Sequence, residues 1–260
     1  LELTEGGLKA RVETPWETPA QESGVATGGV AGLTGLAGLV GSRAVAAAVL
    51  DRTWFRHWVR QGLTNAVGHE VAGLAGPVGE GPVGLALLGG DYSGRFMAVR
   101  LPTLLVGIAG SPVAQTRHVL DALDRLNART RWGLVAAPLL VENAPAFAIE
   151  STGESLYASM NREEHLAYTP TPDGLVFASN LSVLERLLRE RTAGAATNRP
   201  PWLDDVSRAQ AGHVRASLWF NAVEGARVVR LGVTAWSLKL LLEDAQGSQD
   251  TRQRMNEFKA

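Results

Sequence analysis

The chain has no cysteine among its 260 residues. This absence excludes a disulfide framework, a thiolate nucleophile and a cysteine-ligated zinc site. Lysine is also scarce, because Lys9, Lys239 and Lys259 are the only lysines and arginine supplies almost all of the positive charge. With a formal net charge of -1, the molecule has no overall positive field to attract polyanions. Nucleic acid is therefore not an expected partner.

Motifs of common catalytic and nucleotide-binding sites are missing too. The chain has neither the GxSxG turn of hydrolases nor the GxxxxGKS/T phosphate loop. Residues 79–84 match GxGxxG, but they precede an apolar run, whereas a dinucleotide site follows a strand and opens a helix. His69 and Glu70 begin like a zinc-protease motif without its second histidine, and we interpret all five histidines as ordinary surface or core residues. We expect no cofactor, no metal site and no catalytic residue, so a non-catalytic role is favoured over an enzyme.

Pairs of neighbouring acids are the remaining candidates for acid–base or cation-binding chemistry. They are Glu163-Glu164, Asp204-Asp205 and, on an expected helix, Asp121 with Asp124. Adjacent residues of a strand point to opposite faces, and the helical pair has arginines one turn away at Arg117 and Arg125. We interpret all three pairs as solvent-facing.

Apolar residues make up 45% of the chain and charged residues 20%, a balance typical of a packed globular protein. We expect a single domain over residues 1–260, with a subdivision near residue 150 as the alternative. The chain begins without methionine, so we interpret it as a fragment of a longer protein. Residues 24–42 carry no charge but are rich in glycine, which favours a close-packed soluble segment over a membrane-spanning helix.

Local patterns predict several helices and strands. Glycine recurs every third residue from 29 to 41, which favours a helix with a stripe of small residues over a compact glycine loop. Alternation predicts a strand over residues 8–12, and apolar residues three and four apart predict short helices from Arg43 to Gly73. Strands are predicted at the apolar runs 83–88, 96–101 and 103–108. The glycine-rich link at residues 89–94 predicts a hairpin turn.

A strand followed by a capped amphipathic helix recurs three times. The strands are residues 104–108, 175–178 and 213–220. The first helix begins after Ser111, the second after Asn180 or after Ser182, which has capping-box spacing with Glu185, and the third after Asn221. A hairpin over residues 164–179, turning at 170–174, precedes the second unit. The sequence therefore predicts an α+β fold: an antiparallel or mixed sheet built from hairpins, with amphipathic helices packed on it as candidate degenerate strand–helix repeats.

One cluster stands out as a candidate binding surface. Arg52, Arg56 and Arg60 follow one another at steps of four, and Trp54 and Trp58 lie between them. On a helix this spacing makes a basic stripe flanked by aromatic rings, suited to phosphate groups, an anionic membrane surface or an acidic partner. The alternative, which burial tendencies favour, is an amphipathic helix with its tryptophans in the core and its arginines in water.

Three neighbouring features carry a family resemblance. They are the strand at Pro82–Leu88, the hairpin strand Asp173–Asn180 that ends in Ala-Ser-Asn, and the leucine-rich helix after it. In the order of its elements, the chain from Ala44 to Val229 resembles a broad class of uncharacterised bacterial extracytoplasmic domains, which often belong to membrane-anchored or lipoprotein chains. The resemblance implies an extracytoplasmic location and assigns no functional residue.

The leading hypothesis is a non-catalytic extracytoplasmic binding or assembly domain, with a protein partner or a membrane-associated assembly. The first alternative is an enzyme whose site is assembled from scattered residues. The second is a binder of anionic surfaces through the Arg/Trp helix. A polar pocket with converging ionisable groups would favour an enzyme or a small-molecule receptor, and a flat apolar patch would favour assembly.

Overall fold

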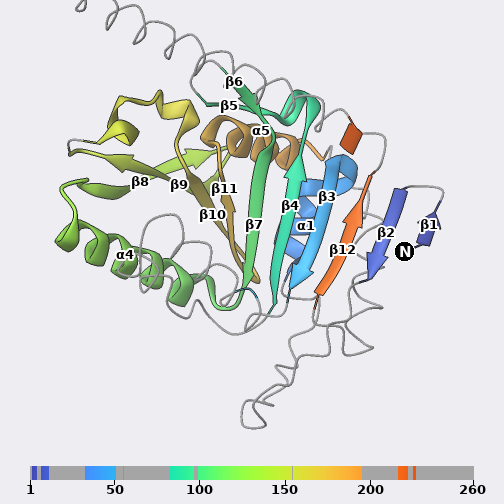
Figure 1. Ribbon diagram of the computed structural model, residues 1–260. Coiled ribbons are helices and arrows are strands. Elements are labelled where there is room, and N and C mark those ends of the chain that lie inside the picture. Colours follow the sequence, from blue (N-terminus) through green and yellow to red (C-terminus); the bar gives the residue numbers. More distant parts are fainter. Residues whose placement is uncertain are drawn as a thin grey trace, which may run out of the picture.

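A large antiparallel sheet organises the protein (Figure 1). The computed structural model describes residues 2–4, 7–11, 33–50, 55, 82–96, 99–153, 155–194, 216–221 and 225–226. Ten strands pair in the order β1-β2-β12-β3-β4-β7-β11-β10-β9-β8, and β5 and β6 form a separate two-stranded ribbon. Every described pairing is antiparallel. The predicted α+β class is confirmed, with an antiparallel sheet.

The elements have the following bounds. The sheet strands are β1 Glu2–Thr4, β2 Gly7–Arg11, β3 Ala44–Leu50, β4 Val83–Leu88, β7 Thr103–Ala109, β8 Leu134–Val141, β9 Ala144–Ser151, β10 Ala167–Thr171, β11 Gly174–Ala178 and β12 Ala216–Phe220, and the ribbon strands are β5 Gly94–Phe96 and β6 Val99–Leu101. The α-helices are α1 Thr34–Val40, α4 Pro112–Arg129 and α5 Leu181–Thr192, and the 3-10 turns are η2 Gly41–Arg43, η3 Gly90–Tyr92, η4 Leu156–Ser159 and η5 Arg162–Glu164.

Different helices cover the two faces of the sheet. On β11, Val176 belongs to the core that α1 and α5 share, whereas the next residue along, Leu175, packs with Leu123 of α4. Because neighbouring residues of a strand point to opposite faces, α4 lies across the sheet from α1 and α5. Figure 1 shows α4 beside the β8–β11 end of the sheet and α1 behind β3 and β4.

Helix α1 lies close to the sheet because glycines leave room for it. A Cβ added to Gly84 would lie 2.6 Å from Leu36 Cδ2, and one added to Gly107 would lie 2.9 Å from Leu36 Cβ. A Cβ on Gly35 would lie 2.7 Å from Thr171 Cγ2 in β10 and closer still to its hydroxyl oxygen. The helix predicted from the glycine stripe is thus present at residues 34–40, and the earlier part of the stripe lies outside the described residues.

An aspartate from the β10–β11 turn caps α1. Thr34 Oγ1 donates to Asp173 Oδ2 at 2.7 Å, and the Gly35 backbone N–H lies 3.2 Å from both carboxylate oxygens. Thr171 Oγ1 donates to Asp173 Oδ1 at 2.9 Å. Burial raises the pKa of the Asp173 carboxyl, but these hydrogen bonds to the charged form outweigh it, so the net pKa is lowered.

The sequence prediction was wrong at Ala44–Leu50, which is a strand and not the start of a helix. Alanine favours a helix, but β3 pairs along its length with β4 on one side and with β12 on the other. Its apolar run is buried or half-buried throughout, as expected for a strand inside a sheet. Of the helical segment predicted from residue 51 to 73, only Phe55 is described, and it is helical.

The hairpin turn predicted at residues 89–94 is also wrong. Strand β4 pairs with β7, and residues 90–92 form the 3-10 turn η3 that leads into the separate ribbon. Backbone hydrogen bonds from Tyr92 N to Gly89 O and from Ser93 N to Gly90 O close this turn locally. The ribbon is thus an insertion between two neighbouring strands of the main sheet, and this position brings it to the site described below.

The first two predicted strand–helix units are confirmed. Ser111 caps α4 with proline at the first helical position, and α5 buries Leu181, Leu184, Leu187 and Leu188. The predicted face of α4 is only partly buried, since Val113 is 71% exposed while Leu123 is 9% exposed. In the third unit, β12 is present, and most of the helix expected after it lies outside the described residues.

Strands from both sides of residue 150 belong to the same sheet. The single domain over residues 1–260 stays a prediction, because large parts of the chain lie outside the described residues. Among the helices within the described ranges, none combines the length and the hydropathy that crossing a bilayer requires.

Candidate functional site: a polar pocket at the start of α5

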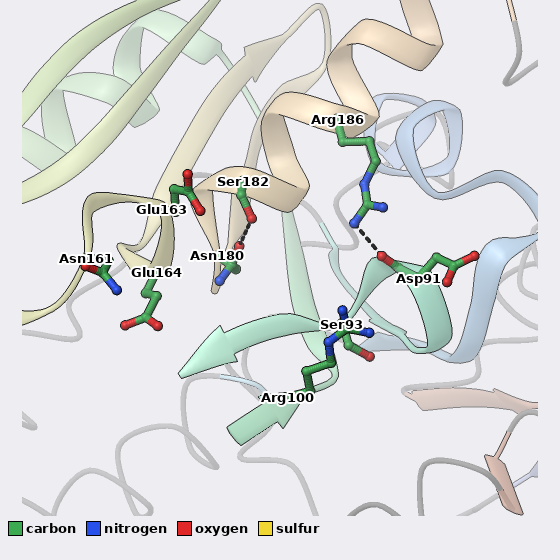
Figure 2. A pocket seen from close by; sticks show the side chains of 9 residues that line it. All are labelled: Asp91, Ser93, Arg100, Asn161, Glu163, Glu164, Asn180, Ser182 and Arg186. Carbon is green, nitrogen blue, oxygen red and sulfur yellow. Dashed lines mark hydrogen bonds between the residues drawn. The ribbon is translucent and has the colours of Figure 1, made fainter. Parts of the chain in front are cut away.

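A polar pocket of about 250 Å³ opens where three distant parts of the chain meet. It lies between the first turns of α5, the turn η5, and the inserted ribbon with its preceding turn η3 (Figure 2). The residues that line it are Asp91, Ser93, Arg100, Asn161, Glu163, Glu164, Asn180, Ser182 and Arg186. All nine side chains are polar or charged, which suits a hydrophilic ligand.

The start of α5 forms the floor of this pocket. Asn180 is 3% exposed, and its Oδ1 accepts hydrogen bonds from Val183 N at 3.3 Å and from Ser182 Oγ at 2.7 Å. Asn180 is therefore the N-cap, one of the two predicted alternatives. The Ser182–Glu185 capping box is not formed, because Ser182 bonds to Asn180 and Glu185 pairs with Arg189 at 3.0 Å.

The ribbon approaches this cap closely. A Cβ added to Gly94, the first residue of β5, would lie 2.6 Å from Asn180 Cγ. Only glycine allows that approach without moving Asn180, whose position the capping bonds hold. The ribbon and the helix start are thereby brought together as two walls of one pocket.

A charged network around Tyr92 holds the ribbon turn against α5. The guanidinium groups of Arg186 and Arg43 lie 4.8 Å and 5.1 Å from the centre of the Tyr92 ring. The Tyr92 hydroxyl donates to Glu190 Oε2 at 3.0 Å, and Arg43 pairs with Glu190 at 2.9 Å. Burial and the hydrogen bond to Glu190 raise the pKa of Tyr92, so the phenol keeps its proton. Arg186 also donates to the backbone oxygen of Asp91.

The opposite wall carries an acid that is largely out of water. Glu164 is 6% exposed, and within the described part of the chain no hydrogen bond or ion pair reaches its carboxylate. Arg162, two residues earlier, pairs with Glu150 at 2.6 Å instead. The interpretation of Glu163-Glu164 as solvent-facing was therefore wrong for Glu164 and holds for Glu163, which is exposed. The pair lies in a 3-10 turn, where the strand rule used for it does not apply.

An aromatic stack lies beside η5. The His165 ring is 6% exposed and stacks on Tyr157 with ring centres 4.6 Å apart. The Tyr157 hydroxyl donates to Ile149 O at 2.6 Å and accepts from Leu166 N at 2.9 Å, and burial raises its pKa to about 12. His165 is therefore a core histidine, one of the two alternatives that the sequence left open, and it follows directly after Glu164.

Charge is distributed unevenly across the pocket. Figure 2 shows Asn161, Glu163 and Glu164 on one side and Ser93, Arg100 and Asp91 on the other. Arg100 is exposed, and no described residue pairs with it. Ser93 Oγ is buried, and no hydrogen bond within the described residues satisfies it. Nowhere in the described ranges do three or more histidine, cysteine or acidic side chains come together as a metal site would need.

The site residues named from sequence do not form this pocket. Arg52, Arg56, Arg60, Trp54 and Trp58 lie outside the described residues, as do Asp204 and Asp205, so the basic stripe stays a prediction. Asp121 and Asp124 are exposed on α4, as expected. Sequence reasoning missed the pocket because its residues come from three separate segments, 91–100, 161–164 and 180–186. Only the helix cap at Asn180 has a local sequence signal.

No protein-family model, curated protein or solved structure matches this chain. The functional argument therefore depends on the pocket itself, and the resemblance to bacterial extracytoplasmic domains stays a prediction.

Proposed function

We propose that this protein is a non-catalytic, extracytoplasmic binding domain that takes up a small polar molecule in the pocket at the start of α5. One observation carries the proposal: Glu164 as a residue is 6% exposed, its side chain lines a polar pocket, and its carboxylate has no partner among the described residues. Removing an ionised carboxylate from water is unfavourable unless hydrogen bonds or an opposite charge compensate. A ligand that enters the pocket would supply that compensation.

The size and lining of the pocket support a small and hydrophilic ligand. A volume of about 250 Å³ is slightly below the range of drug-sized sites, which begins at roughly 300 Å³ and is mostly apolar. Here every lining side chain is polar or charged. Such groups give specificity because a ligand that fails to match them leaves them desolvated and unpaired.

A ligand screen by thermal unfolding tests this function. The panel contains amino acids, amines, carboxylates, polyols and sugars, and the measurement is the melting temperature of the protein with each. A compound at one hundred times its Kd stabilises the folded state by about 2.7 kcal/mol. At about 2 to 4 °C per kcal/mol, the expected rise in Tm is about 5 to 10 °C.

Calorimetric titration of each hit against wild-type protein and two variants then locates the binding site. Glu164→Gln should weaken binding, whereas Glu142→Gln should not, because Glu142 is exposed in the β8–β9 turn and does not line the pocket. A panel without any binder, or a binder equally tight in all three proteins, contradicts the proposal.

The extracytoplasmic location is supported by the resemblance of residues 44–229 to a class of such domains. Fractionation of cells that produce the full-length chain, with protease added to intact cells or spheroplasts, tests it. Digestion of the domain is expected, and protection together with cytoplasmic enzymes contradicts the location.

An enzyme is the second candidate, because three acids, Asp91, Glu163 and Glu164, line the same pocket. Acids that line one pocket can serve acid–base chemistry as well as binding. Incubating each hit with the protein and analysing it by mass spectrometry separates the two: an unchanged compound favours binding, and a product that Glu164→Gln fails to form favours the enzyme.

A further inference from the structure

Glu164 is unusual among the carboxylates of the described residues. The half-buried acids there all have partners: Asp173 is bonded to Thr34, Thr171 and Gly35, Glu150 to Arg162, Glu185 to Arg189, and Glu190 to Arg43 and Tyr92. The acids without described partners are exposed, with Glu164 as the exception. Glu164, the most buried of these acidic residues, is thus the one whose carboxylate the described parts of the chain leave unmatched.

The surroundings of Glu164 determine which kind of group can match it. Glu163 belongs to the same turn, η5, and lines the same pocket, so it adds a second negative charge beside Glu164. Two neighbouring carboxylates favour a positive charge over a neutral donor. The described residues offer no cluster of metal ligands, so an organic cation such as an ammonium group fits better than a directly bound metal ion.

The other side of the pocket carries Arg100 and Ser93 beside one acid, Asp91. Arg100, on β6, has no described partner, and its neighbour Ser93 has a buried hydroxyl oxygen without a hydrogen bond in the described residues. Arg186 is held by the Asp91 backbone oxygen and the Tyr92 ring, which leaves Arg100 as the more available guanidinium. A guanidinium beside a hydroxyl suits a carboxylate or a phosphate group of a ligand.

We propose that the pocket binds a zwitterionic small molecule, with its ammonium group on Glu164 and its anionic group on Arg100 and Ser93. This inference rests on the proposed binding function and adds the class of ligand. Figure 2 shows the two charged ends on different sides of the pocket, with Asn180 and Ser182 between them. A molecule with separated charges of both signs satisfies both ends at once, whereas a simple cation or anion satisfies one.

A matched set of compounds tests this class. The zwitterions are β-alanine, γ-aminobutyrate and δ-aminovalerate, and the single-charge and neutral controls of similar shape are butylamine, butyrate and butanediol. Calorimetry should show at least one zwitterion binding more tightly than every control by about 10-fold or more, since a lost charge-assisted contact is worth more than 1.4 kcal/mol.

Two variants assign the charges of the ligand to the two ends. Glu164→Gln should weaken zwitterion binding by about 30-fold or more, because a buried charge pair loses one partner. Arg100→Gln should weaken it by about 5-fold, because Arg100 is exposed and screened by water. Glu142→Gln, which lies outside the pocket lining, should bind as wild type does.

The possible outcomes separate this inference from the function on which it rests. Butylamine, butyrate or butanediol binding as tightly as the zwitterions, or unchanged affinity in Glu164→Gln, overturns the zwitterion class and leaves the binding function standing. A hit from the wider panel that lacks a cationic group has the same consequence. Absence of any binder removes both proposals together.

Discussion

Replacing Gly35 and Gly38 by alanine, one at a time, tests how α1 is held on the sheet. Both residues lie inside the same seven-residue helix. At Gly38 an added Cβ meets no atom within 4 Å, whereas at Gly35 it would lie 2.7 Å from Thr171 Cγ2. The two variants add the same methyl group to the same helix, so their difference measures the packing against β10.

The expected effects have opposite signs. Alanine in place of glycine favours a helix by up to about 1 kcal/mol, so Gly38→Ala should be more stable than wild type. Gly35→Ala gains the same helix propensity, but its methyl group forces Thr171 away. Inserting a methyl group into a packed core costs about 1 to 3 kcal/mol. We expect the upper end of that cost, because the methyl group meets the Thr171 Cβ, which is attached to the strand backbone. The net loss for Gly35→Ala is then about 2 kcal/mol.

Thermal and urea unfolding of the two variants, measured beside wild type, give the comparison. A difference of about 3 kcal/mol between them corresponds to about 6 to 12 °C in Tm. Gly35→Ala melting at or above Gly38→Ala would refute the close packing of α1 on β10. Equal losses in both variants would point to a helix that is not formed at these residues.

Three further predictions concern charged and polar groups. Asp173→Asn should remove the stabilisation that comes from the ionised Asp173 carboxylate. The pKa of Asp173 is lowered in the folded state, so this stabilisation is present above the unfolded pKa of about 3.9 and is lost as the pH falls through the folded pKa. Urea midpoints of wild type should thus fall more steeply below pH 4 than those of Asp173→Asn, and parallel curves would contradict the assignment. Glu164→Gln should raise the stability of the ligand-free protein by at most about 1 kcal/mol in urea unfolding, since Glu164 is a buried residue whose carboxylate has no described partner, and a marked loss of stability would show that Glu164 has a structural partner. Tyr92→Phe keeps the ring that contacts Arg43 and Arg186 but loses the hydrogen bond to Glu190, so it should lower stability by about 1 kcal/mol, and an unchanged Tm would mean that this bond is replaced by water.

Elements with local signals were predicted well from the sequence. Ser111 with its following proline and Asn180 after a strand begin helices where predicted, because a capping side chain bonds to the backbone within three residues. The strands at residues 83–88 and 103–108 were found because their apolar runs are short and are bounded by glycine or proline. The β10–β11 hairpin was also predicted, although Pro170 lies within the strand and not in the turn.

Elements that depend on distant partners were not predicted. Strand β3 was taken for a helix, and the hairpin of β8 and β9 was missed. The turn of that hairpin consists of Glu142 and Asn143 with φ of 47° and 66°, so it lacks the glycine by which such turns are usually recognised. In both cases the strand forms because it pairs with another strand, and this pairing cannot be recognised from the residues of the strand alone.

The amino-acid sequence by itself determined the α+β class, the absence of cysteine chemistry, the start of α4 and, to within two residues, the start of α5, because composition and short-range hydrogen bonding suffice for these. Only the tertiary structure decided which strands pair, that the ribbon inserted after β4 reaches Asn180, and that Glu164 is buried while Glu163 is exposed. Burial and charge pairing depend on residues far apart in the chain. The pocket is built from such residues, so it exists only once the sheet, the ribbon and α5 have come together.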